Sequence, residues 1–195
     1  MGELNSLLKE FEKKLSDFDD KLLESLAPGL PQTEVFSLLE KVNVRDEKLV
    51  NLYVWKNGCN YDEYAIGERD ICSFGQMLSL KSAIEIYNIS VIENNSWEKR
   101  FFPIIGEGGG IYVLINVDRE HENYGMLYLF APSFILKENP QTIFDSLECF
   151  FETQILCFGN NVFKKKEGGY WDINYDLEKE ISVRINSKSE YWKYD

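Results

Sequence analysis

Three short apolar runs in the middle of the sequence constrain the fold more than any other feature. They span 101–105, 111–117 and 126–130, and they are rich in β-branched and aromatic residues. A glycine-rich segment and a charged segment separate them. Such runs are typical of β-strands joined by turns. The sequence therefore predicts three consecutive strands of an antiparallel β-meander.

The segment before these runs has a helical period. From Leu4 to Leu26, apolar residues recur at alternating spacings of four and three, with charged residues between them. This spacing places them on one face of an amphipathic helix, and the segment from Pro28 to Pro31 would end it. The repeat is too short to indicate a coiled coil, so we expect the helix to pack against its own domain.

Four more helices are predicted from the same kind of spacing. Thr33 is interpreted as an N-cap, Asn57-Gly58 as a helix end, and Ser82 with Glu85 as a capping box. The predicted helices span 33–41, 46–56, 82–93 and 142–158.

Near the C-terminus, Ile181, Val183 and Ile185 alternate with polar residues, which predicts one more strand. The whole pattern predicts an α+β fold. We expect a single domain over 1–195, in which several helices pack an antiparallel β-meander.

The charge balance narrows the class of partner. The chain has 33 Asp and Glu against 21 Lys and Arg, which gives a formal net charge of −12. Such a chain repels phosphate backbones and anionic lipids, so neither nucleic acid nor a membrane is expected as a partner. The acidity either keeps the surface soluble or attracts a basic protein, and both interpretations stay open.

The four cysteines predict no metal centre and no redox pair. Cys59, Cys72, Cys149 and Cys157 form no C-x-x-C pair and have no neighbouring histidine at ligand spacing. We expect buried thiols and no cofactor, because a chain of this size buries enough surface without a metal or disulfide. No signal peptide or long apolar run is visible, so a cytoplasmic location is expected, and the oligomeric state stays open.

Two features of the sequence bear on catalysis. The segment 106–110 is rich in glycine but lacks the Gly-Lys-Ser/Thr ending of a phosphate-binding loop, so we interpret it as a hairpin turn with Glu107 at its tip. The alternative is a loop presented to a ligand. His121 is the only histidine, and a loop histidine is favoured over a general base because no nucleophile motif accompanies it.

Several motifs follow one another in the middle of the chain. They are Leu30-Pro31, a helix ending in Asn57-Gly58, Trp97 leading into Phe102-Pro103-Ile104, the glycine-rich turn with its aromatic and aliphatic strand, and a closing helix around 143–151. In this order they resemble the SUKH superfamily, which is named for yeast regulators of cell-wall synthesis and includes many bacterial relatives. The resemblance covers 28–158, and it leaves the N-terminal helix 4–26 and the extension 159–195 outside the pattern.

The resemblance implies an α+β fold without catalytic residues. Bacterial relatives in this superfamily are mostly immunity proteins, which neutralise a toxin by direct binding. We therefore expect a non-enzymatic protein-binding module, most concretely an immunity protein that binds a cognate toxin such as a nuclease. An acidic inhibitor suits this role because nucleases carry basic clefts for phosphate.

Two other functions stay open. One is a regulatory scaffold of the cell-wall-synthesis regulator type, and the other is an enzyme built on a carboxylate pair or on the glycine-rich loop. For the binding function, we expect acids in the loops between strands, with two aromatic anchors. These residues are Glu107, Asp118, Glu120, Glu122, Trp97 and Tyr112.

Overall fold

The computed structural model describes residues 2–60, 62–65, 67–133, 140–167 and 169–193, and these form one α+β body. The helices are α1 (Gly2–Phe18), α2 (Asp20–Ser25), α3 (Gln32–Glu40), α4 (Glu47–Trp55), α5 (Leu80–Tyr87), α6 (Leu147–Gly159) and α7 (Tyr175–Ile185). A π-helix, η1 (Asn88–Glu93), continues α5, and a short 3-10 helix, η2 (Tyr191–Lys193), lies near the C-terminus.

Five strands form the main sheet, in the order β3-β4-β5-β6-β7, and all neighbours are antiparallel. The predicted meander is confirmed as β4, β5 and β6. Two strands that the sequence did not indicate, β3 and β7, extend it on either side. The strands are β3 (Gln76–Met77), β4 (Phe101–Gly106), β5 (Tyr112–Asn116), β6 (Leu127–Phe130) and β7 (Gln141–Phe144).

Two small hairpins accompany this sheet. The first pairs β1 with β2, and the second pairs β8 with β9. Their strands are β1 (Leu26–Pro28), β2 (Lys56–Cys59), β8 (Phe163–Lys165) and β9 (Trp171–Ile173).

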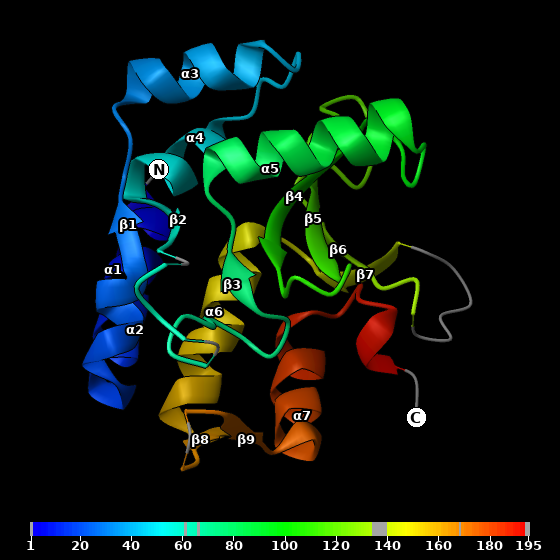
Figure 1. Ribbon diagram of the computed structural model, residues 1–195. Helices are drawn as coiled ribbons and strands as arrows, with labels where there is room; N and C mark the ends of the chain where they lie inside the picture. The colour runs from blue at the N-terminus through cyan, green and yellow to red at the C-terminus, as the bar shows by residue number, and fades with distance from the viewer. Residues whose placement is uncertain (1, 61, 66, 134–139, 168, 194–195) are drawn as a thin grey trace.

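Helices cover the main sheet on both sides. In Figure 1, α5 lies across one face of β4, β5 and β6, and α6 lies on the other side. The ring of Tyr87 in α5 packs 5.6 Å from that of Phe102 in β4. Because both faces are covered, all six residues of β4 are buried. This explains why β4 reads as a continuous apolar run rather than an alternating one.

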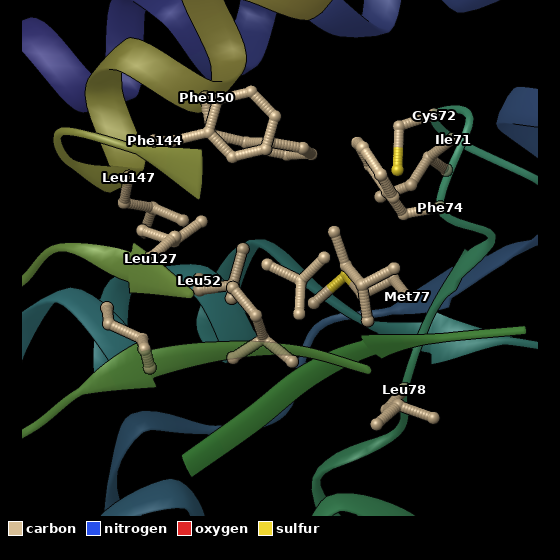
Figure 2. Close-up of a cluster of buried hydrophobic side chains, with 14 of the residues drawn as sticks. Leu52, Ile71, Cys72, Phe74, Met77, Leu78, Leu127, Phe144, Leu147 and Phe150 are labelled. Carbon is tan, nitrogen blue, oxygen red and sulfur yellow. The ribbon is translucent and has the colours of Figure 1, made fainter. Parts of the chain in front are cut away.

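The core on the α6 side joins distant parts of the chain. Figure 2 shows Phe144 beside Phe150, and Leu127 beside Leu147. Phe74 comes from the segment before β3, and its ring lies 6.3 Å from that of Phe144. All five of these side chains are buried, and removing their apolar surface from water stabilises the fold.

The N-terminal prediction needs one correction. The single helix predicted over 4–26 is two helices, α1 and α2, because Asp19 is extended and caps α2 by accepting the Lys21 backbone N–H at 3.1 Å. Asp19 also pairs with Lys165 of β8. Residues Leu26 to Pro28 then form β1 instead of ending a helix.

Two helix starts also differ from the prediction. The helix α3 begins at Gln32, so Thr33 is not its cap. The helix α5 is capped by Ser79, whose hydroxyl accepts the backbone N–H of Ser82 at 3.1 Å. The predicted capping box at Ser82 and Glu85 is therefore wrong, because the helix begins three residues before the box would allow.

The helix predicted over 142–158 is partly wrong. Residues Gln141 to Phe144 form β7, which pairs with β6 and so extends the meander. Ser146 then caps α6 by accepting the backbone N–H of Cys149 at 3.1 Å. The spacing of apolar residues did not distinguish β7 from α6, because apolar residues continue across the boundary between them.

The strand predicted around Ile181 to Ile185 is wrong, because this segment lies in α7. Leu177, Ile181 and Ile185 are spaced by four, which places them on one helix face. Ile181 is buried and Val183 is exposed, so the alternation in the sequence does not reflect two faces of a strand.

The C-terminal segment after α7 lies along β7. The Ser189 hydroxyl donates to the carbonyl of Thr142 at 3.0 Å, and the Glu190 backbone N–H donates to the same carbonyl at 3.1 Å. The Trp192 indole donates to the carbonyl of Ile143 at 2.9 Å. The extension is therefore part of the main body.

The expectation of buried thiols is confirmed for three of the four cysteines. All four thiols are free; Cys59, Cys72 and Cys157 are buried, and Cys149 is half-buried. Within the described ranges, every helix is too short or too polar to cross a membrane.

Candidate functional site

The four predicted acids do not form one surface. Glu107 follows β4, whereas Asp118, Glu120 and Glu122 follow β5. The five residues of β5 span about 17 Å. Because β5 pairs antiparallel with β4, this length separates the turn that contains Glu107 from the loop that contains the other three acids. All four side chains are exposed, but Glu107 lies at the opposite end of the meander from the other three.

The aromatic anchors fare differently. Trp97 is only 5% exposed, its ring packs 4.8 Å from that of Phe130, and its indole donates to the carbonyl of Phe101 at 3.0 Å. The expectation that Trp97 anchors a partner is therefore corrected, because it is a core residue. Tyr112 is half-buried against Trp97, so it reaches the surface only in part.

The glycine-rich segment is a hairpin turn, as predicted, because β4 and β5 pair on both sides of it. Gly108 and Gly110 have φ of 86° and 92°, which favours glycine. Glu107 lines a cavity of about 230 Å³ that also includes Asp70 and Cys72. Burial raises the pKa of Asp70, and the nearby Glu107 acts in the same direction.

This small cavity offers no complete metal site. Within the described part of the chain, no group of three or more histidine, cysteine, aspartate or glutamate residues is placed to hold a metal ion. His121 lies elsewhere, in the loop after β5, where its Nδ1 accepts the backbone N–H of Asn123 at 3.1 Å.

An acidic concave surface lies between α1 and α6. It is a groove of about 610 Å³ with four carboxylates and one lysine. Apolar side chains from both helices complete it. We call it the α1–α6 groove, and its lining is Glu3, Leu7, Glu10, Lys48, Ser146, Glu148, Cys149, Glu152, Ile155 and Leu156.

Packing between the two helices holds the groove open in a fixed shape. The ring of Phe11 in α1 lies 5.2 Å from that of Phe151 in α6, in an edge-to-face arrangement. Trp55 of α4 packs 5.6 Å from Phe151 and donates from its indole to Glu12 at 3.0 Å. Because these rings are large and interlocked, the two helices cannot easily slide past one another.

One carboxylate of the groove is already paired. Lys48 Nζ lies 2.7 Å from Glu148 Oε2. Burial acts to raise the pKa of Glu148, but the hydrogen bond from Lys48 and the other local donors outweigh it, so the pKa is lowered. Glu3, Glu10 and Glu152 are exposed, and no described cation forms an ion pair with them. Three carboxylates are thus left for a partner.

Sequence reasoning missed this groove, although a signal was present. Glu3, Leu7 and Glu10 are spaced i, i+4, i+7 on α1. Glu148, Glu152 and Ile155 repeat the same spacing on α6. Each set shares one helix face, so both faces combine acids with apolar residues. The spacing does not show that these two helix faces line the same groove.

No protein-family model matches this sequence, and the comparison with curated proteins also gives no match.

Proposed function

We propose that this protein is a non-enzymatic protein-binding module, and that it acts as an immunity protein that neutralises a basic toxin by direct binding. The observation that carries the proposal is the α1–α6 groove, which presents three unpaired carboxylates beside apolar side chains. A groove of this kind suits a protruding basic segment, because opposite charge speeds association while apolar contact adds affinity.

The SUKH resemblance supports the proposal from a separate direction. Its motifs occupy structurally demanding places: Gly58 has φ of 78°, and the Asn57 side chain accepts the backbone N–H of Leu80 at 2.9 Å. The Phe102-Pro103-Ile104 motif lies in β4, an inner strand of the main sheet that is buried along its whole length. These motifs therefore support the fold that the resemblance implies, and the acidic groove supports the proposed binding of a basic partner.

The groove replaces the loops as the proposed contact. Asp118 and Glu120 lie beside several basic side chains, so the loop after β5 is not an acidic surface on its own. Glu107 stays a candidate for a second, smaller contact at the other end of the sheet. Tyr112 is half-buried and contributes at most an edge.

The test measures neutralisation of a toxin. The probe is the toxic C-terminal domain of a secreted protein encoded next to this gene, expressed with or without this protein in a host that the toxin kills. We expect co-expression to restore growth, and the purified proteins to form an equimolar complex. The complex should weaken at about 0.5 M salt, because its charges are screened.

A matched pair of variants locates the contact. The triple change E3K/E10K/E152K reverses three groove carboxylates and raises the net charge from −12 to −6. The control E34K/E85K/E180K makes the same change in charge at exposed acids outside the groove. Protection lost in the first triple only supports the groove. Equal loss in both would assign the effect to total charge, and a complex that leaves the toxin active would favour the scaffold function.

A further inference from the structure

A second groove, of about 680 Å³, differs from the rest of the molecule in charge. It lies where the turn between α3 and α4, the end of α5 with η1, the segment leading into β4, and the loop between β5 and β6 meet. Two acidic and five basic side chains line it, an excess of three positive charges in a protein of net charge −12. We call it the basic groove, and its basic residues are Lys41, Arg45, Lys99, Arg100 and Arg119.

Most of this positive charge is not neutralised within the protein. Lys41 and Lys99 are exposed, and neither forms an ion pair within 4 Å in the described part of the chain. Arg45 lies 3.6 Å from Glu40, but both side chains are more than 70% exposed, at 83% and 73%, so this pair contributes little. The groove therefore keeps cations that can be offered to a ligand.

Arg100 is held in place at the edge of the groove. Its Nη2 donates to Glu98 at 2.9 Å, and its guanidinium lies 4.6 Å above the ring of Phe101. Its Nε is buried without an acceptor. A guanidinium fixed in this way loses little side-chain entropy when it binds an anion.

Arg100 and His121 make a contact that lacks an acceptor. The Asn123 backbone N–H donates to Nδ1 of His121, so the neutral ring carries its proton on Nε2. That Nε2 faces Nη1 of Arg100, which is itself a donor. Arg100 therefore keeps an Nη1 donor that His121 does not satisfy.

We propose that the basic groove binds a small organic polyphosphate of nucleotide size. The groove has the volume of a small-molecule site. Its cations converge from three segments, which suits clustered phosphate groups, and Val42, Val117 and the exposed Ile92 offer apolar surface to a ring. A long nucleic acid is disfavoured because it would extend over the surrounding acidic surface.

This site does not depend on the proposed toxin binding, because no residue lines both grooves. The experiment is isothermal titration calorimetry of the full chain with four probes: ATP, tripolyphosphate, adenosine and a single-stranded DNA oligonucleotide. We expect ATP and tripolyphosphate to bind at low salt and to weaken as salt is added. We expect adenosine alone not to bind.

A matched pair of double variants tests the assignment. K41Q/K99Q removes the two unpaired lysines of the groove, and K13Q/K81Q removes two exposed lysines elsewhere with the same change in charge. The first should weaken ATP binding at least about tenfold and the second by less than about twofold. All four lysines are exposed, so circular dichroism should show both variants folded.

Three outcomes would overturn the proposal. They are no binding of either polyphosphate at millimolar concentration, equal binding by K41Q/K99Q and the original protein, and tighter binding of the oligonucleotide than of ATP. The last would assign the groove to extended nucleic acid.

Discussion

The hydroxyl of Ser73 donates a 2.5 Å hydrogen bond to Oε1 of Glu178, which lies 105 positions later in the sequence. This contact joins the segment before β3 to α7 and leaves a carboxyl group only 1% exposed. Burial raises the pKa of Glu178 to about 7, although the hydrogen bond from Ser73 acts in the opposite direction.

The raised pKa predicts a pH dependence of stability. Below the ordinary value of 4.5, Glu178 is protonated in both the folded and unfolded states, so it imposes no cost on folding. As the pH rises to about 7, the unfolded state loses its proton first, and the folded state loses about 3 kcal/mol of stability relative to it. We therefore expect E178Q to be more stable than the original protein at pH 8 and nearly equal to it at pH 4.5.

Urea unfolding at several pH values measures this difference. E180Q is the control, because Glu180 is an exposed glutamate of the same helix. A constant difference between E178Q and the original protein from pH 4.5 to 8 would contradict the prediction.

A second prediction concerns Asp46, which is buried and serves two partners. Its Oδ1 accepts the backbone N–H of Leu49 at 2.9 Å and so caps α4, while its Oδ2 accepts the hydroxyl of Tyr124 at 2.6 Å. Burial, together with this carboxylate, raises the pKa of Tyr124 to about 12. We expect D46A to lower the free energy of unfolding by about 2 kcal/mol, because a cap and a buried hydrogen bond are both lost.

D46N is the conservative comparison. Its side-chain oxygen can still cap α4, so thermal or urea unfolding should show less than half of the loss seen for D46A. If the two variants lose the same amount, the cap is not what Asp46 contributes.

A third prediction uses two glycines with similar backbone angles and different surroundings. Gly58 has φ of 78°, and a Cβ there would lie 2.3 Å from the backbone nitrogen of Ser79. Gly108 has φ of 86°, with nothing within 4 Å of such a Cβ. G108A should cost about 1 kcal/mol for the backbone angle alone, whereas G58A should cost about 3 kcal/mol or more because the Ser79 backbone must move. Equal losses in urea unfolding would show that the close approach is not important.

The fourth prediction concerns thiol reactivity. Burial raises the pKa of Cys59 to about 12 and also raises the pKa of Cys72 and Cys157, all of which are buried. Cys149 is half-buried, and its pKa is raised as well. With a thiol reagent at pH 8, Cys149 should react first, and the other three only as fast as the protein opens. C149S should then show no early phase; an early phase that persists would mean that a buried thiol is accessible.

The sequence predicted structure best where a run of one class of residue has clear boundaries. The strands β4, β5 and β6 were predicted because β-branched and aromatic runs are bounded by glycine or charge. It failed where neighbouring elements share apolar residues, as at the join of β7 and α6, and where Ile181, Val183 and Ile185 of α7 follow one another two residues apart. In both places tertiary pairing decides the structure, and local spacing does not report it.

The binding surfaces could be predicted only in part. The four acids lie in loops between strands, as the sequence predicted. That Glu107 is separated from the other three by the length of β5 follows from the antiparallel pairing, which the positions of the acids do not show. Trp97 illustrates the opposite problem, because an aromatic residue beside charged neighbours gives no sign that its ring faces Phe130. Both grooves combine elements that are distant in the sequence, so neither could be found from spacing alone.

The C-terminal segment covers the outer side of β7, the last strand of the main sheet. The outer side of a last strand offers unpaired backbone groups that can template pairing with another chain. Here, backbone and side-chain donors of Ser189 and Glu190 occupy the Thr142 carbonyl, and Trp192 covers the neighbouring Ile143 carbonyl. A chain that ends before Ser189 would expose the backbone groups of β7. We expect such a chain to aggregate through pairing of this strand, and not through loss of the hydrophobic core.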